Sequence, residues 1–248
     1  MKKILFLLLM ANCSFSVVNT LFAQRLTITT ERIEVTNELD AHPDQRALDI
    51  LARYKPAVDS IMTPVLGESL TGMSGGRPES LLSNWVSDVL VEFSSFEDGK
   101  PADMGLCNMG GLRNNMPKGT VHRGDIILIS PFNNRLCIAH LKGSDLLALF
   151  RDIAAVHGEG VSREVRLVIT PDGQLVDAKV GGKPIDPQRV YRIATLDYLA
   201  EGNDHLYSLK KALRVNVSEL FTRDCLMESV QRHSPITSAI EGRITLKE

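Results

Sequence analysis

The sequence predicts an α+β fold in which a mixed β-sheet packs with α-helices. The chain has 248 residues, the size of one compact domain or at most two small ones. Apolar residues alternate between strand-like and helix-like spacing, and one segment has the pattern of a β-hairpin. No internal repeat or low-complexity linker interrupts the sequence, so we expect a single globular unit after the N-terminal region.

The first residues have the pattern of a secretory signal peptide. Lys2 and Lys3 precede an apolar run that ends at Met10, and small and polar residues continue to Ala23, where we expect cleavage. The apolar run is too short for a membrane span, which needs about 20 residues, and no later segment reaches that length. The sequence therefore predicts an exported protein, periplasmic or at the cell surface, without a membrane span.

The rest of the chain is expected to form one domain after a short leader. A lipoprotein anchor at Cys13 is the less favoured alternative, because Asn12 is not the small apolar residue expected before an acylated cysteine. The expected parts are a signal peptide at 1–23, a polar leader at 24–42 and a globular domain at 43–248.

Four helical segments are expected from apolar residues at helical spacing. The first covers 48–61, where Pro56 predicts a kink or break. The second runs from about 79 to 93, and the third starts with Ser144 as N-cap. The fourth contains the apolar residues of 220–230.

Short strands are expected between these helices. The most distinctive pair is a hairpin, because alternating apolar residues flank the turn sequence Thr-Pro-Asp-Gly at 170–173. The expected strands are 104–107, 136–141, 165–169, 175–180, 191–196 and 243–246.

Charge and cysteine content exclude several classes of protein. The 28 Lys and Arg residues are spread along the chain against 30 Asp and Glu, so no basic stripe suggests a nucleic-acid partner. Cleavage of the signal would leave Cys107, Cys137 and Cys225, an odd number with wide spacing. We expect these to be buried thiols rather than a disulfide framework or metal site.

Three segments, 107–113, 129–134 and 195–205, combine glycine, aromatic and polar residues unusually. In the first, paired glycines would let a ligand approach the backbone beside an arginine. In the second, a proline fixes the backbone before an aromatic ring that could stack on a base. In the third, a carboxylate could accept hydrogen bonds from two ribose hydroxyls. Taken alone, each is explained more simply as a turn, a buried ring or a helix start.

Together these segments resemble the C-terminal domain of the 5'-nucleotidase family. Asn-x-Gly-Gly-x-Arg at 108–113 is followed by Pro-Phe-x-Asn at 131–134 and Lys-Gly-Ser-x-Leu at 142–146. A tyrosine-led strand then ends in aromatic-Leu-Ala-x-Gly-x-Asp, within 191–204. The resemblance implies a 5'-nucleotidase C-terminal-domain-like fold that holds the nucleoside part of the substrate. A separate metallophosphatase domain with two metal ions would cut the phosphate ester.

The resemblance also implies roles for individual residues. Two aromatic rings would sandwich the base, two asparagines would hydrogen-bond to it, and an arginine and an aspartate would hold the ribose. In that order the pairs are Phe132 with Tyr198, Asn108 with Asn134, and Arg113 with Asp204. Gly110, in the glycine pair, and Arg77 would complete the substrate-binding set.

Three departures from the family pattern affect this site. Tyr198 stands where many members have Phe, which adds a hydroxyl to the stacking ring. The usual Gly-Gly-Asp-Gly reads Gly-Asn-Asp-His at 202–205, so the loop is expected to bend differently. Ser162 is followed by Arg163 instead of a second small residue, and Arg163 is expected to narrow the site.

Two of the three metal-binding motifs of the catalytic domain are absent from the 248 residues, and the Asp-x-His spacing occurs only at 40–42, in the polar leader. The family uses Asp-x-His, Gly-Asn-His-Asp/Glu and Gly-His-x-His to place two ions about 3.5–4 Å apart. The histidines outside the third segment are expected to be surface or locally bonded residues: His42, His122, His140, His157 and His233. We therefore expect no cofactor on this chain, and divalent metals on a partner metallophosphatase.

Three hypotheses follow. The favoured one is an exported nucleoside-binding subunit that works with a separately encoded metallophosphatase to hydrolyse nucleoside 5'-monophosphates. The second is a binding module that captures nucleosides without a part in catalysis. The third is a structural protein with a vestigial pocket, which the changes at Arg163 and 202–205 would favour.

Overall fold

The computed structural model describes residues 28–41 and 43–247, so the signal peptide expected at 1–23 lies outside the described residues. Contacts divide the chain into two units, 1–51 and 52–248. Helix α2 (Gln45–Met62) includes Pro56 in its interior. The break expected there does not occur, because a proline removes only one backbone hydrogen bond and the remaining turns continue the helix.

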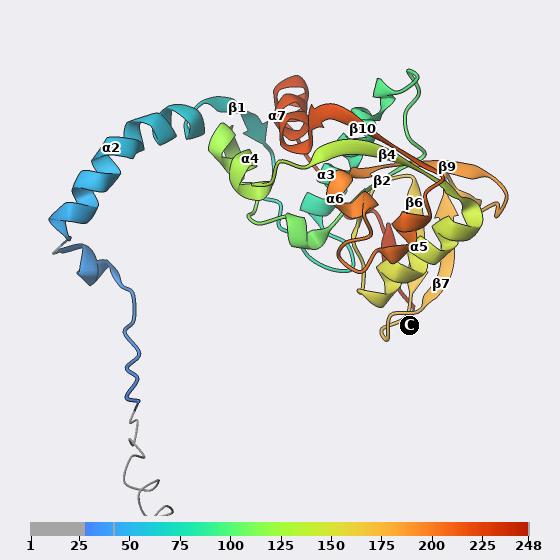
Figure 1. Cartoon of the computed structure of the whole chain (residues 1–248), viewed down its shortest axis with the longest axis horizontal. Helices are drawn as coiled ribbons and strands as arrows, with labels where there is room; N and C mark the ends of the chain where they lie inside the picture. The colour runs from blue at the N-terminus through green and yellow to red at the C-terminus, as the bar shows by residue number, and fades with distance from the viewer. Residues whose placement is uncertain (1–27, 42, 248) are drawn as a thin grey trace, which may run out of the picture. The chain divides into compact units, whose positions relative to one another are not determined.

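The centre of the larger unit is a five-stranded mixed sheet, in the order β10-β4-β9-β2-β5 (Figure 1). Its strands are β2 (Met104–Cys107), β4 (Arg135–Lys142), β5 (Gly160–Val161), β9 (Val190–Leu196) and β10 (Arg214–Phe221). Strands β2 and β9 are parallel, and the other neighbours are antiparallel. The α+β class with a mixed sheet is therefore confirmed.

Two smaller sheets accompany it. One has the order β11-β6-β7-β8 and contains the hairpin expected from the sequence. Its strands are β6 (Val165–Ile169), β7 (Leu175–Val180), β8 (Lys183–Pro184) and β11 (Ile244–Leu246). The other pairs β1 (Val65–Ser69) with β3 (Gly119–His122).

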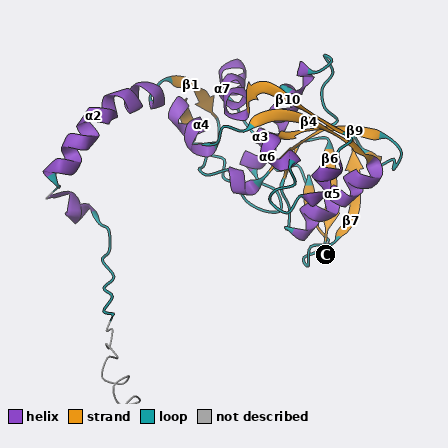
Figure 2. Ribbon diagram, in the orientation of Figure 1, coloured by secondary structure: helices purple, strands orange, loops and turns teal. Residues whose placement is uncertain are grey.

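Helices pack on these sheets (Figure 2). The helices of the larger unit, apart from α2, are α3 (Leu81–Glu92), α4 (Arg123–Ile129), α5 (Gly143–Ala155), α6 (Asp197–Ala200) and α7 (Thr222–His233). Short 3₁₀ turns are η2 (Ser94–Phe96), η3 (Met109–Gly111) and η4 (Tyr207–Lys211), and η1 (Asn37–Ala41) lies in the first unit. Helix α5 contacts both β4 and β7, and so joins the five-stranded sheet to the four-stranded one.

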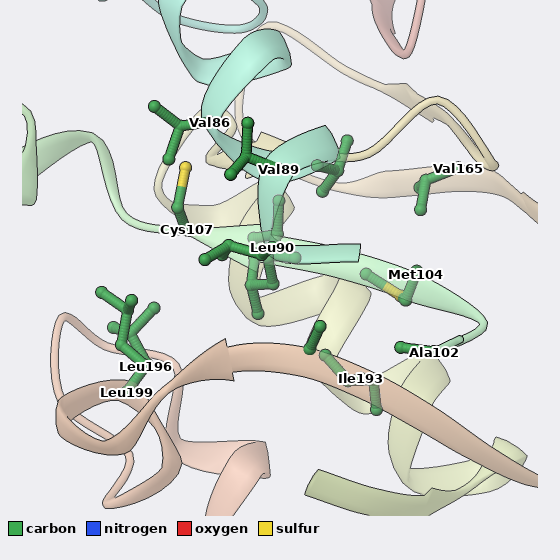
Figure 3. Packing of buried hydrophobic residues seen from close by; sticks show 14 of the residues in the cluster. Val86, Val89, Leu90, Ala102, Met104, Cys107, Val165, Ile193, Leu196 and Leu199 are labelled. Atoms are coloured by element: carbon green, nitrogen blue, oxygen red, sulfur yellow. The ribbon is translucent and has the colours of Figure 1, made fainter. Parts of the chain in front are cut away.

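Helix α3 packs directly on strand β2 because Gly105 has no side chain. A Cβ at Gly105 would lie 2.2 Å from the carbonyl oxygen of Ser87 in α3. Helix α3 buries Val86, Val89 and Leu90, whose side chains lie beside β2 in Figure 3. The glycine thus allows the backbones of α3 and β2 to approach closely, and this approach sets the separation between helix and sheet.

Two helix starts differ from the sequence prediction. Ser144 is not the N-cap of α5, because the helix begins one residue earlier, where the Gly143 N–H donates to the carbonyl oxygen of Arg189. Leu220 and Phe221 belong to strand β10 rather than to the last helix, which begins at Thr222. Both boundaries involve contacts with residues distant in sequence, Arg189 for α5 and Arg135 of β4 for the end of β10.

The three cysteines within the described residues are confirmed as buried thiols. Cys107, Cys137 and Cys225 are unpaired and buried. Burial raises the pKa of each thiol to about 12, because the thiolate would lose its hydration in the core.

Candidate functional site

Strand pairing brings the three singled-out segments to one edge of the central sheet. Because β2 and β9 are parallel, the segments that follow them, 108–113 and 197–205, leave the sheet at the same edge. Strand β4 is antiparallel to β9, with Leu136 opposite Leu196, so 131–134 enters the sheet at that edge. Residues almost a hundred positions apart are thereby placed side by side.

Asp204 is the centre of the hydrogen-bond network at this edge. The amide of Asn108 donates from Nδ2 to one carboxylate oxygen of Asp204, and the hydroxyl of Tyr198 donates to the other at 2.8 Å. The hydrogen bond to Asp204 raises the pKa of the Tyr198 hydroxyl. Gly110 lies beside the same carboxylate, since a Cβ there would be 3.4 Å from Oδ2.

Asn108 carries an acceptor that the described residues leave unused. Its side chain is 4% exposed, and Oδ1 is buried without a hydrogen-bond donor from the described chain. A Cβ at Gly111 would lie 2.6 Å from this oxygen, so a larger residue at that position would displace the Asn108 amide. Buried polar atoms are rarely unpaired, so this oxygen is suited to a donor from a ligand or from a water molecule in the small cavity that Asn108 lines.

Two aromatic rings remain open at the edge of the site. Phe132 is 38% exposed and Tyr198 is 41% exposed, so a ligand can reach both residues. The guanidinium of Arg113 lies 5.3 Å from the centroid of the Phe132 ring. Phe132 and Asn134 also line a cavity of about 20 Å³, which has room for roughly one water molecule. A base would therefore have to lie on the exposed ring faces rather than inside this cavity.

Glu159 is a site residue that the sequence analysis missed. Its carboxylate is 2% exposed, pairs with the guanidinium of Arg77, and accepts the N–H of Met109 at the start of the glycine turn. Arg77 also donates from Nε to the carbonyl oxygen of Gly158 at 2.7 Å. Burial raises the pKa of Glu159, opposed by the Met109 N–H and by Arg77. The sequence feature that could have identified Glu159 is its position between two glycines, at 158 and 160.

Arg77 and Arg113 line a second, polar cavity of about 350 Å³ beside Phe132. The rest of its wall is formed by the glycines at 75 and 76, Met109, Leu112, and the asparagines at 114 and 115. Its volume falls in the range of small-molecule sites, about 300–1,000 Å³. All eight residues implied by the resemblance thus lie in one connected region.

Arg163 does not narrow this region, so that expectation is wrong. Its guanidinium pairs with Asp88 of α3 at 2.8 Å. Both residues line a larger cavity of about 650 Å³, together with Trp85 and Arg243. None of the eight implied residues lines that cavity.

The loop at 202–205 has a left-handed bend, although only the first of the three glycines in the family pattern is present. Asp204 and His205 have φ angles of 53° and 65°, and Gly202 has a φ of 75°. Asparagine, aspartate and histidine adopt this region more readily than most residues. Asp204 and His205 therefore adopt this bend without glycine at their positions.

The histidines with acidic partners have structural contacts. His140 is bonded to Glu97, and His233 is bonded to Glu92, whereas His42 lies outside the described residues. Within 28–41 and 43–247, no three His, Cys, Asp or Glu side chains are placed to hold a metal ion. Over the same ranges, no helix combines the length and apolarity needed to cross a bilayer.

Comparison with known proteins agrees with the geometry. Residues 61–211 match the family described as 5'-nucleotidase, C-terminal domain. The chain belongs to this family. This 5'-nucleotidase C-terminal domain is 24% identical over 214 residues to protein UshA of Yersinia enterocolitica, covering 85% of this chain and 38% of the relative. It is 30% identical over 216 residues to endonuclease YhcR of Bacillus subtilis, covering 83% of this chain and 17% of the relative.

Solved structures show the same fold. A 5'-nucleotidase precursor from Thermus thermophilus superposes with a TM-score of 0.74 at 26% identity, covering 84% of this chain and 44% of that one. The NAD nucleotidase of Haemophilus influenzae gives a TM-score of 0.63 at 19% identity, over 82% of this chain and 41% of that one. The domain therefore spans less than half of each of these structures.

Proposed function

We propose that this 5'-nucleotidase domain binds the nucleoside part of nucleoside 5'-monophosphates, which a separately encoded metallophosphatase hydrolyses outside the cytoplasm. The observation that carries the proposal is the convergence of exposed rings, a half-buried carboxylate and an unpaired buried acceptor at one sheet edge. Export rests on the signal-peptide pattern of residues 1–23.

Each group at this edge suits one part of a nucleoside. The exposed faces of Phe132 and Tyr198 can stack on a base, which contributes about 1–3 kcal/mol per base and tolerates different bases. Asn108 and Asn134 offer hydrogen bonds to the base, and Asp204 offers its carboxylate to the ribose. Binding energy from these contacts would orient the phosphate at the metal site of the partner.

The first test is calorimetric titration of adenosine and AMP into the protein. We expect both to bind with similar affinity, because the phosphate would project toward the absent partner. Phe132→Ala should weaken binding by about tenfold or more, from the loss of one stacking contact. Phe96→Ala is the matched control, since Phe96 is 37% exposed and lies outside the site. Absence of binding to the native protein would refute the proposal.

The second test addresses the partner. Adding the protein to an isolated metallophosphatase domain of a 5'-nucleotidase should raise AMP hydrolysis by about tenfold or more. Addition of Phe132→Ala should give a much smaller increase. Nucleoside binding without activation would instead identify a binding module, and neither binding nor activation would identify a structural protein with a vestigial pocket.

A further inference from the structure

Tyr198 is held against Asp204 by its own loop. The two residues are six positions apart, and the left-handed φ of Asp204 turns its carboxylate back toward helix α6. Asn203 reinforces this turn, because its Nδ2 donates to the carbonyl oxygen of Tyr198 at 2.7 Å. The N–H of Gly202 also donates to the carbonyl oxygen of Leu199 at 2.8 Å. The hydroxyl of Tyr198 therefore donates to Asp204 without any ligand present.

Both carboxylate oxygens of Asp204 have a donor before any ligand arrives. Tyr198 supplies one and Asn108 supplies the other. A site that binds a substrate hydroxyl usually rejects the analogue without it, because an acceptor of the protein is then left unpaired. Here the hydroxyl of Tyr198 keeps Asp204 paired when the ligand lacks a donor. An analogue that lacks a ribose hydroxyl therefore leaves no acceptor of Asp204 unpaired, and this basis for rejecting it is missing.

We propose that Tyr198 sets the sugar specificity of the site, its hydroxyl replacing a missing ribose hydroxyl at Asp204, so that 2'-deoxyribonucleosides bind about as well as ribonucleosides. This inference rests on the proposed nucleoside-binding function. A phenylalanine at position 198 would keep the stacking ring and remove the donor. The Asp204 oxygen that Tyr198 pairs in the native protein would then depend on a ribose hydroxyl for its donor. Ribonucleosides would therefore bind more tightly than 2'-deoxyribonucleosides.

The chain offers a matched control in the same region. The hydroxyl of Tyr207 is 3.0 Å from Nδ1 of His205 and makes no hydrogen bond to Asp204. Tyr207→Phe therefore removes a tyrosine hydroxyl close to the site without changing the donors to Asp204. Any effect specific to Tyr198→Phe reports on the contact with Asp204.

The experiment measures dissociation constants of adenosine and 2'-deoxyadenosine for the native protein, Tyr198→Phe and Tyr207→Phe. We expect the two constants to agree within about threefold for the native protein and Tyr207→Phe. In Tyr198→Phe adenosine should bind about tenfold or more tightly than 2'-deoxyadenosine, the scale of one charged hydrogen bond. A native preference for adenosine that Tyr198→Phe leaves unchanged would overturn this inference while supporting nucleoside binding. Failure of both nucleosides to bind any of the three proteins would overturn both proposals.

Discussion

Glu159→Ala should destabilise the domain measurably. The substitution removes the acceptor for the Met109 N–H and the partner of the Arg77 guanidinium. Breaking a fully buried ion pair costs about 3–5 kcal/mol, but Arg77 is 40% exposed and can be hydrated. We therefore expect a loss of about 1–3 kcal/mol in the free energy of unfolding. For a domain of this size, that loss corresponds to a melting temperature lower by about 2–10 °C.

Thermal unfolding followed by circular dichroism measures this loss. Glu219→Ala is the matched control, because Glu219 pairs with Arg135 while its side chain is 91% exposed. Exposed ion pairs contribute about 0–1 kcal/mol, so the control should melt close to the native protein. Equal melting temperatures for Glu159→Ala and Glu219→Ala would refute the argument that Glu159 braces the glycine turn.

The pH dependence of Glu159→Gln provides a further check on the same residue. Burial holds the folded-state pKa of Glu159 above its ordinary value of 4.5, so protonation favours the folded form. The native protein should therefore gain stability relative to Glu159→Gln as the pH falls from about 7 toward 4.5. If the native protein instead lost stability relative to Glu159→Gln as the pH fell over that range, the ion pair with Arg77 would outweigh the effect of burial on this pKa.

The remaining predictions concern the core. Gly105→Ala should lower the free energy of unfolding by about 1–3 kcal/mol or more, because its Cβ would overlap the Ser87 carbonyl. Gly72→Ala is the control and should cost little, since its Cβ would be 3.7 Å from the nearest atom. Chemical denaturation would compare the two variants. Arg243→Leu should lower the free energy of unfolding by about 3 kcal/mol in the same assay, because it removes a 2% exposed side chain that pairs with Asp88. A loss below about 1 kcal/mol would contradict this. The described cysteines should resist thiol reagents at about pH 8 until the protein unfolds, and rapid labelling of the native state would show that they are not buried.

The sequence predicted the elements whose pattern is local. The hairpin at 165–180 and helix α3 have turn residues and apolar spacing that need no tertiary partner to be recognised. Strand β10 was missed and its last residues were given to helix α7, because its edge position leaves Val215 and Val217 partly exposed and its pairing partner lies far away in the chain.

The site shows the same division. Its motifs identified eight residues by type and order, and the structure brings them together through the parallel pairing of β2 and β9. Glu159 was missed although it stands between two glycines, because its role depends on Arg77, eighty-two positions earlier. Arg163 was misplaced for a related reason: Asp88, which attracts its guanidinium to the other cavity, is seventy-five positions away. Partners this distant follow from topology rather than from local pattern.

Hydrogen exchange with and without adenosine can locate the nucleoside site, because it reports on the backbone amides of all the loops in one experiment. Bound adenosine should slow exchange in all three converging segments, 108–113, 131–134 and 197–205. It should cause no change in 235–241, which lines the larger cavity around Arg163. Protection confined to 235–241, or no protection in the converging segments, would contradict the assignment of the nucleoside site to this edge of the sheet.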